Sequence, residues 1–325
     1  MVKQDNSRIA KPMSRMITPL AQVLEEPQSV KQSVFSHDTT FSLFRKLVIY
    51  KLMGNDLFLN YAAPVTRIAY TLMGKSLTNG LINATAGSIF TSGETTTSLK
   101  TDIDTLSDRN IGGIGNYVVE GLEHIDNPKI DNIEKYMVQS LLDISDEGQT
   151  GHFALKLSAL LSINAMRQLS DAQDQFTQIL LTSRNNVNKI TSEAVLASLQ
   201  NSLGIQTNLE EVKNLLSSIS FNEDKNQITD FEVFSKGHLF KLETHDQTFL
   251  LNKIAQCLGV NDELAAECKK FTARNLNIGN VAYQNGCKLY VDAEQSYIQP
   301  VIDSLAMQLS SLFNRGDRVT IMNGF

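Results

Sequence analysis

The stretch KLYVDAEQSYIQPVIDSL (Lys288–Leu305) decides how this chain is interpreted. A short apolar run, Leu289–Val291, ends in two acidic residues, Asp292 and Glu294. A stretch follows in which apolar residues recur every three or four positions, which is the spacing of a helix. A buried parallel strand that delivers acidic side chains to the carboxyl-terminal edge of a barrel has this pattern. The stretch therefore predicts a βα unit with Asp292 and Glu294 at that edge.

Predicted strands and helices alternate along the rest of the second half of the chain. The strands are expected at Ile111–Gly121, His152–Leu160, Lys288–Gln295 and Arg318–Met322. The helices between them are expected at Asp131–Ile144, Ala165–Leu181 and Gln299–Phe313. This alternation is typical of a parallel sheet, and nearly continuous apolar strands fit burial on both faces. The sequence therefore predicts an α/β fold of about four βα units.

The first third of the chain has a different pattern of apolar residues. From Phe41 to Leu106 the apolar spacing is helical, and Thr91 or Ser92 is a candidate cap for its last helix. Residues 1–38 mix basic, serine and apolar residues, which suits a mitochondrial transit peptide or, equally well, a disordered arm. The predicted organisation is thus an arm over 1–38, a helical arm over 39–108 and a partial βα barrel over 109–325.

Composition narrows the class of protein. The chain has 325 residues, 42% of them hydrophobic, and a net charge of −6. This charge argues against a general basic surface for nucleic acid. No apolar run approaches the length that spans a bilayer. Three cysteines without a CxxC pair argue against a disulfide framework or a cysteine zinc site, and five histidines show no metal-like spacing. A reducing compartment such as cytosol or mitochondrial matrix fits best.

A segment at about 198–250 is too long for one crossover helix and predicts a helical insertion. Part of it resembles half of an EF-hand, because Asn222, Asp224 and Asn226 alternate as calcium ligands do. Gln227 stands where the glycine of the sharp turn belongs, and Glu232 falls one position short of the bidentate ligand. The expected structure is therefore a solvated helix-loop-helix without bound calcium.

Lys156 interrupts an otherwise apolar predicted strand. Alternation places Lys156 on one face with Ala154 and Ser158, and it gives Asp292 and Glu294 a common face on their own strand. An unpaired buried charge is costly, so we expect Lys156 to point to solvent at the strand end or to pair with one of these acids. A structural salt bridge and a functional site both explain such a pair.

Four segments, in order, resemble motifs of the proline dehydrogenase family. VDAEQSYIQPVI (Val291–Ile302) matches fully, and ALKLSAL (Ala154–Leu160) matches closely. IGNYVVE (Ile114–Glu120) matches in part, and FTSGE (Phe90–Glu94) looks like the family's helical arm. Asn116 stands where the family has an aspartate on its first strand, which puts the electrostatics of that strand in doubt. The chain is therefore identified by resemblance as a member of this family over roughly 40–325.

The resemblance implies a fold, a cofactor and a reaction. Family members are distorted (βα)₈ barrels of the TIM type with noncovalent FAD, which oxidise L-proline to Δ1-pyrroline-5-carboxylate. In eukaryotes the electrons go to quinone, and the expected location is the matrix side of the mitochondrial inner membrane, in association with its surface. By motif, Lys156 would lie beside the flavin and attract the substrate carboxylate. Asp292 would hold the surrounding groups by ion pairing, and Glu294 would contact the cofactor; these are orienting roles.

About four predicted strands are half of what a closed barrel of this type needs. RVTIMNGF (Arg318–Phe325) looks like the family's fourth strand, and the family's paired arginines do not occur in this sequence. The expectation is therefore an incomplete version of the enzyme, with little flavin binding or proline oxidation of its own. Three alternatives stay open: a hydroxyproline dehydrogenase, an inactive remnant that acts through protein–protein contacts, and a βα enzyme of other chemistry.

Overall fold

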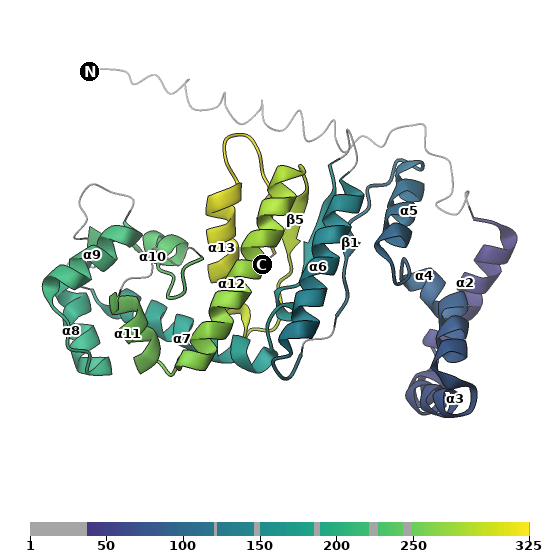
Figure 1. Cartoon of the computed structure of the whole chain (residues 1–325), viewed down its shortest axis with the longest axis horizontal. Coiled ribbons are helices and arrows are strands. Elements are labelled where there is room, and N and C mark those ends of the chain that lie inside the picture. Colours follow the sequence, from purple (N-terminus) through teal and green to yellow (C-terminus); the bar gives the residue numbers. More distant parts are fainter. Residues whose placement is uncertain are drawn as a thin grey trace, which may run out of the picture. The chain divides into compact units, whose positions relative to one another are not determined.

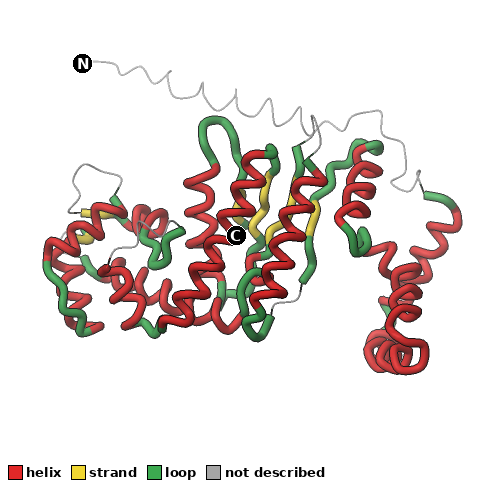
Figure 2. The backbone as a smooth tube through the Cα atoms, viewed as in Figure 1, coloured by secondary structure: helices red, strands yellow, loops and turns green. Residues whose placement is uncertain are grey.

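The computed structural model describes residues 38–119, 122–145, 150–184, 189–220, 227–242 and 249–324. Helices dominate, and the strands are short (Figure 2). The contacts divide the chain into two compact units, residues 1–93 and 94–325. Among the residues described, no helix combines the length and the apolar character that crossing a membrane requires.

The first unit is helical, as its apolar spacing predicted. It contains α2 (Thr40–Met53), α3 (Asp56–Ile82), the π-helix η1 (Asn83–Gly87) and α4 (Ser88–Phe90). The side chain of Thr39 caps α2, and that of Asn55 caps α3 by accepting from the backbone N–H groups of the first turn. Gly74, with φ of 77°, kinks α3. Within α2 and α3, Thr78 is the one buried residue, so these helices bury almost nothing inside the unit.

The second unit is built around a four-stranded parallel sheet. Its strands, in spatial order, are β1 (Gly115–Asn116), β2 (His152–Leu155), β5 (Lys288–Val291) and β6 (Ile321–Asn323). Each neighbouring pair is parallel, which confirms the prediction from the βα alternation. The mixed α/β architecture is compatible with part of an α/β barrel.

The strands are shorter than the sequence predicted. The segment expected as a buried first strand forms only β1, and Ile114 and Val118 beside it are exposed. The second ends at Leu155 because the chain turns into the 3-10 helix η2 (Leu157–Ala159). The third ends at Val291, so the acidic residues lie in the loop that follows it rather than in the strand.

Helices cover one face of this sheet (Figure 1). They are α6 (Asn127–Ile144), α7 (Ile163–Thr182), α12 (Asp262–Gln284) and α13 (Gln299–Phe313), and α13 has the predicted bounds. A further helix, α5 (Thr96–Ser107), packs on α6. Its cap is Thr95, in a capping box with Ser98, and not the predicted Thr91 or Ser92.

A buried arginine ties three of these elements together. The Arg274 guanidinium on α12 donates to Asp131 Oδ1 on α6 at 2.6 Å and to Asn127 Oδ1 at 2.7 Å. It also donates to the carbonyl oxygen of Leu160, just after η2, at 3.4 Å. Its side chain is 6% exposed, so this ion pair lies at the edge of the core and fixes the chain behind the end of β2.

The sequence placed the start of the helical segment between α7 and α12 at about residue 198, but the segment begins earlier than this. It contains β3 (Ile190–Thr191), α8 (Ser192–Leu203), α9 (Leu209–Ile219), β4 (Gln227–Ile228), α10 (Asp230–Lys236) and α11 (Phe249–Cys257). β3 pairs with β4 in antiparallel fashion. The expected ligand-like residues Asn222, Asp224 and Asn226 lie outside the described residues. Glu232 is buried and closes a capping box with Thr229 at the start of α10.

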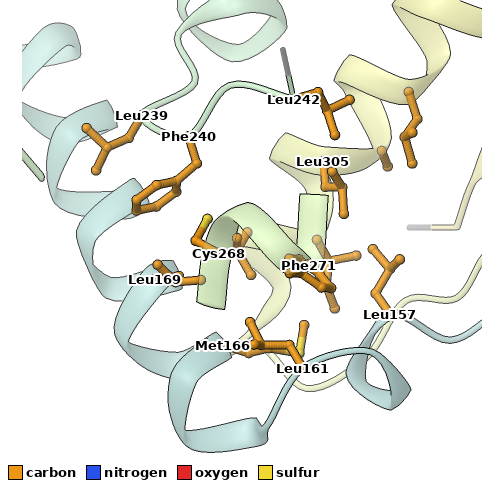
Figure 3. Close-up of a cluster of buried hydrophobic side chains, with 14 of the residues drawn as sticks. Leu157, Leu161, Met166, Leu169, Leu239, Phe240, Leu242, Cys268, Phe271 and Leu305 are labelled. Atoms are coloured by element: carbon orange, nitrogen blue, oxygen red, sulfur yellow. The ribbon is translucent and has the colours of Figure 1, made fainter. Parts of the chain in front are cut away.

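The chain after α10 shares the core of the sheet-covering helices. Figure 3 shows one cluster that contains Leu157, Leu161, Met166, Leu169, Leu239, Phe240, Leu242, Cys268, Phe271 and Leu305. Two glutamines fasten the backbone of this segment. Gln173 Oε1 on α7 accepts from the N–H of Leu239 at 2.8 Å, and Gln308 Oε1 on α13 accepts from the N–H of Leu242 at 3.0 Å. The helical segment is therefore part of the same folded unit as the sheet.

Candidate functional site at the carboxyl-terminal edge of the sheet

The register of β2 and β5 brings Lys156 and Asp292 to the same edge of the sheet. Leu155 lies opposite Val291, so the next residues across the pair are Lys156 and Asp292. The Asp292 N–H donates to the carbonyl oxygen of Leu155 at 3.1 Å, which extends the ladder by one more bond. Since the strands are parallel, their carboxyl ends meet here, as the sequence predicted.

Alternation gives the two faces of these strands different surroundings. Phe153, Leu155, Leu289 and Val291 are buried beneath the helices. The opposite face carries the half-buried side chains of His152, Ala154, Lys156, Lys288, Tyr290 and Asp292, and we call it the open face. The prediction that Ala154 and Lys156 share a face is confirmed. The prediction for Ser158 is wrong, because η2 breaks the alternation after Lys156 and buries Ser158.

Glu294 is bonded to the turn that follows Lys156. The Ser158 N–H donates to Glu294 Oε1 at 3.1 Å, and the Ser158 hydroxyl donates to Oε2 at 2.5 Å. One carboxylate thus accepts two hydrogen bonds from a buried serine, and hydrogen bonds to a charged acceptor are the stronger kind. Glu294 therefore joins the loop after β5 to the turn after β2, and so fixes the chain beside Lys156.

A further polar chain, which sequence reasoning missed, holds the loop that carries Glu294. The Glu294 N–H donates to Gln299 Oε1 at 2.9 Å, and Gln299 Nε2 donates to Asp303 Oδ1 at 2.8 Å. Asn323 Nδ2, at the end of β6, donates to the same Asp303 oxygen at 3.1 Å. The spacing of Gln299 and Asp303 by one helical turn was the available signal, since both lie at the start of the predicted helix. The ends of β2, β5 and β6 are thus linked by side chains.

Burial shifts the pKa of Asp292. Desolvation raises the pKa of this carboxyl above its ordinary value of 3.8, the negative charge of Glu294 raises it further, and the Lys156 ammonium opposes both. Lys156 and Asp292 therefore interact electrostatically. Among the described residues, however, the close ion pairs do not include Lys156, so of the two expected alternatives the structure does not show pairing at contact distance.

A cavity of about 490 Å³ opens beside Lys156. Its lining consists of Glu123, Lys156, Ser158, Ile163, Asn164, Glu294, Gln295 and Tyr297. The Arg167 guanidinium lies 4.5 Å from the centre of the Tyr297 ring, a cation–π contact at the rim. Asp292 is not among the lining residues. This volume is in the range of small-molecule sites, and the lining combines one ammonium with two carboxylates and several neutral hydrogen-bonding groups.

The opposite end of the open face holds a second polar pair that sequence reasoning missed. His152 Nδ1 lies 2.7 Å from the Tyr290 hydroxyl, and the two rings stack with centroids 5.8 Å apart. Burial, and then the charge of Lys288, lower the pKa of His152 below its ordinary value of 6.5. The period-two pattern could have placed each residue on this face, but only the register of β2 against β5 brings them together.

His238 is the other histidine with a structural role. It is buried, its Nε2 lies 2.9 Å from the carbonyl oxygen of Ser235, and its Nδ1 lies 3.0 Å from the Ser304 hydroxyl on α13. Burial lowers its pKa to about 4. Across the described ranges, no group of three or more His, Cys, Asp or Glu side chains is placed to hold a metal ion.

Comparison with known proteins supports a family relationship. The chain is 27% identical over 220 residues to proline dehydrogenase 1, mitochondrial, of Caenorhabditis elegans. The match covers 64% of this chain and 34% of the relative, so the chain spans about a third of the relative's length. The relationship to the proline dehydrogenase family that the motifs predicted is thereby supported. No family model matches the chain, and no solved structure matches it.

Proposed function

We propose that this chain takes part in the flavin-dependent oxidation of L-proline to Δ1-pyrroline-5-carboxylate, with electrons passed on to quinone. The observation that carries the proposal is the placement of Lys156 beside Asp292 at the carboxyl-terminal edge of a parallel sheet. These two residues belong to the segments that most closely resemble the family, ALKLSAL and VDAEQSYIQPVI. The similarity to a proline dehydrogenase supports the same reaction class.

In this proposal Lys156 binds and orients the substrate. L-Proline carries a carboxylate, and the Lys156 ammonium borders a cavity whose other lining groups include only two acids, Glu123 and Glu294. The Glu294 carboxylate is already engaged by two hydrogen bonds from Ser158, so it competes less for the ammonium. Within the described residues Lys156 is not held in a close ion pair, so its donors remain for a ligand.

Asp292 and Glu294 act as positioning residues in this proposal. Asp292 lies across the strand pair from Lys156, and the Lys156 ammonium opposes the rise in the pKa of Asp292. Glu294 fixes the η2 turn and with it the backbone that carries Lys156. The cofactor proposed for the site is FAD, which when bound supplies the acceptor for the hydride equivalent. Lys156 and the carboxylate of Glu294 are the groups proposed to lie beside it.

The proposed location follows from the relative, whose name places it in mitochondria. We propose that this chain also works in mitochondria, at the matrix side of the inner membrane, where a quinone acceptor is available. The further proposal for the fold is that the four strands are a portion of a (βα)₈ barrel whose interior is the open face. The half-buried polar residues on that face fit an interior that holds ligands rather than one filled by apolar side chains.

The test is an assay of the purified chain with added FAD. The proposal predicts proline-dependent reduction of an artificial dye and a flavin absorbance that stays with the protein on gel filtration. This result would overturn the expectation from the sequence that a chain of about four βα units has little flavin binding or proline oxidation of its own. The same assay with hydroxyproline separates the two substrates, and proline is expected to be the better one. Flavin that remains bound while neither amino acid reduces the dye would contradict the proposed reaction. A chain that retains no flavin would contradict the proposed cofactor.

A further inference from the structure

A small cavity of about 180 Å³ lies between α9, α10, α13 and the chain that follows α10. Helix α10 packs against both α9 and α13, so these helices form the walls of the cavity (Figure 1). The lining includes two lysines, three serines, a histidine and a glutamine, and among the described residues it includes no acid. The cavity beside Lys156 shares none of these residues, so the two cavities are separate sites.

Lys236 and Lys241 bring two positive charges to this cavity. Lys236 Nζ donates to the carbonyl oxygen of Ser220 at 3.4 Å, and Lys241 Nζ donates to the carbonyl oxygen of Lys236 at 3.2 Å. Both side chains are therefore held near the end of α10. A lysine in the last turn of a helix also suits the helix dipole, but this does not account for Lys241, which lies beyond the helix. Two like charges on one small cavity repel each other, and a bound anion would offset that repulsion.

The acids near these elements are engaged elsewhere. Glu232 on α10 takes part in the capping box at the start of that helix. Asp174 and Asp303 line a different cavity, which His238 also borders. Burial, and then the charge of Lys241, lower the pKa of His238 to about 4, so its ring is neutral near pH 7. The described lining thus has a net positive charge, in a chain whose net charge is −6.

The hydroxyl group of Ser235 points to a bound ligand. Its oxygen is buried, and within the described part of the chain it has no hydrogen-bond partner. Buried polar groups are nearly always hydrogen-bonded, so an unpaired one indicates a partner that the chain itself does not supply, such as a water or an ion. Ser235 directly precedes Lys236 and lines the same cavity, so one ligand there would contact the hydroxyl and the ammonium groups together.

We propose that this cavity binds a phosphate group, held by the ammonium groups of Lys236 and Lys241 and by a hydrogen bond from the Ser235 hydroxyl. A phosphate monoester carries a charge of about −1.5 to −2 at pH 7, which matches two lysines, and its oxygens are strong acceptors. A carboxylate fits less well, because it carries one charge. The cavity is smaller than a typical site for a drug-sized molecule, so it suits the phosphate group itself.

The phosphate is either a free ion or part of an ester, and the neighbouring cavity distinguishes the two. Lys241 also lines that cavity, which has a volume of about 370 Å³. Phe249 lies in its wall and is exposed, with Lys253 Nζ 4.5 Å from the centre of the ring. The remainder of an ester would extend into this second cavity, where an aromatic group would stack on Phe249.

The test is a calorimetric titration of the purified chain with inorganic phosphate and with adenosine monophosphate. Saturable binding is expected, and it should raise the pKa of His238 above about 4 in an NMR titration, because the anion offsets the charge of Lys241. Acetate should bind at least roughly tenfold more weakly than phosphate. Adenosine monophosphate that binds at least roughly threefold more tightly than phosphate identifies an ester as the ligand, and equal affinities identify the free ion.

Single variants separate this cavity from a general attraction to lysines. Lys236→Gln and Lys241→Gln should each lower the affinity for inorganic phosphate roughly tenfold, because each removes a charged contact. Ser235→Ala should lower it roughly fivefold, yet without phosphate its melting temperature should be unchanged or slightly higher, since an unpaired buried hydroxyl is removed. The controls Lys253→Gln and Lys269→Gln make the same charge change outside this cavity and should stay within about twofold of the parent.

Two outcomes would overturn the proposal. One is that neither inorganic phosphate nor adenosine monophosphate binds saturably, which would leave water as the partner of the Ser235 hydroxyl. The other is that the control variants weaken binding as much as Lys236→Gln and Lys241→Gln do, which would reduce the effect to attraction between an anion and surface lysines. Proline oxidation is not measured in either experiment, so this proposal stands or fails apart from the proposed function.

Discussion

The two faces of the β2–β5 strand pair carry different kinds of side chain, although they alternate along the same two segments, 152–156 and 288–292. One face buries Phe153, Leu155, Leu289 and Val291 under helices. The open face carries a histidine, two lysines, a tyrosine and an aspartate, all half-buried. Apolar area removed from water stabilises a fold, whereas half-buried ionisable groups contribute little to stability and can meet a ligand. We infer that the buried face stabilises the fold and that the open face carries the residues for ligand binding and chemistry.

The largest effect should come from the buried face. Phe153 is completely buried, so Phe153→Ala should lower the free energy of unfolding by about 3–5 kcal/mol, through lost apolar burial and a cavity. Ala154→Ser, one residue along on the open face, should change it by less than about 0.5 kcal/mol. Urea unfolding followed by circular dichroism measures both. Equal losses for the two variants would mean that the faces do not differ as described.

The next largest effect concerns the link between the two strand ends. Ser158→Ala and Glu294→Gln should each destabilise the chain, and their effects should not add, because both disrupt the hydrogen bond between the Ser158 hydroxyl and the Glu294 carboxylate. A double-mutant cycle should give a coupling energy of about 1.5 kcal/mol, as for hydrogen bonds to a charged group. A coupling energy near zero would show that Glu294 does not hold the η2 turn in solution.

A smaller effect is expected from the carboxyl group at the edge itself. The pKa of Asp292 is raised in the fold, chiefly by burial and then by Glu294, so the native state holds its proton more tightly than the unfolded state does. Stability should therefore fall as the pH rises from about 4 through the raised pKa of Asp292. Asp292→Asn should remove this part of the pH dependence, and Lys156→Met should raise the pKa of Asp292. The pKa of Asp292 in the parent and in each variant is read from carboxyl carbon chemical shifts in an NMR titration. A lower pKa of Asp292 in Lys156→Met than in the parent would contradict the assigned causes.

The smallest effect lies at the other end of the open face. The pKa of His152 is lowered, first by burial and then by Lys288. The native state therefore binds less proton there than the unfolded state, and this contribution to stability is lost as the pH falls below about 6.5. Lys288→Met should raise the pKa of His152 slightly, as read from its ring proton shifts. An unchanged pKa in that variant would leave burial as the whole cause.

The parts of the fold that could be predicted from the sequence rest on clear periodicity. Leu289–Val291 followed by Asp292 predicted a strand that ends at the carboxyl-terminal edge of the sheet, and the spacing after it predicted α13 with its observed bounds. The segment Ile111–Gly121 misled because its glycines and apolar residues look like a buried strand. Only two of its residues pair with β2. In the rest of the described segment Tyr117 and Val119 are half-buried against the core, whereas Ile114 and Val118 are exposed.

The parts of the site that could not be predicted depend on contacts between distant segments. The residue type of Ser158 fits a continued strand, and only the η2 turn shows that its hydroxyl faces Glu294, 136 positions away. The His152–Tyr290 pair depends in the same way on which residues of β2 and β5 lie opposite each other. Lys156 and Asp292 stood out because a charge in an apolar strand and an acid at its end are visible without any register, but only the resemblance to the proline dehydrogenase family gave them expected roles.

The most direct test compares the two lysines of the open face, which stand at opposite edges of the sheet. Proline-dependent dye reduction is measured with FAD for the parent chain, Lys156→Met and Lys288→Met. The account predicts a loss of at least roughly a hundredfold in kcat/KM for Lys156→Met, in the range of a lost charged contact to substrate, and a change below about threefold for Lys288→Met. Equal rates for Lys156→Met and the parent would contradict the claim that the carboxyl-terminal edge is the functional site.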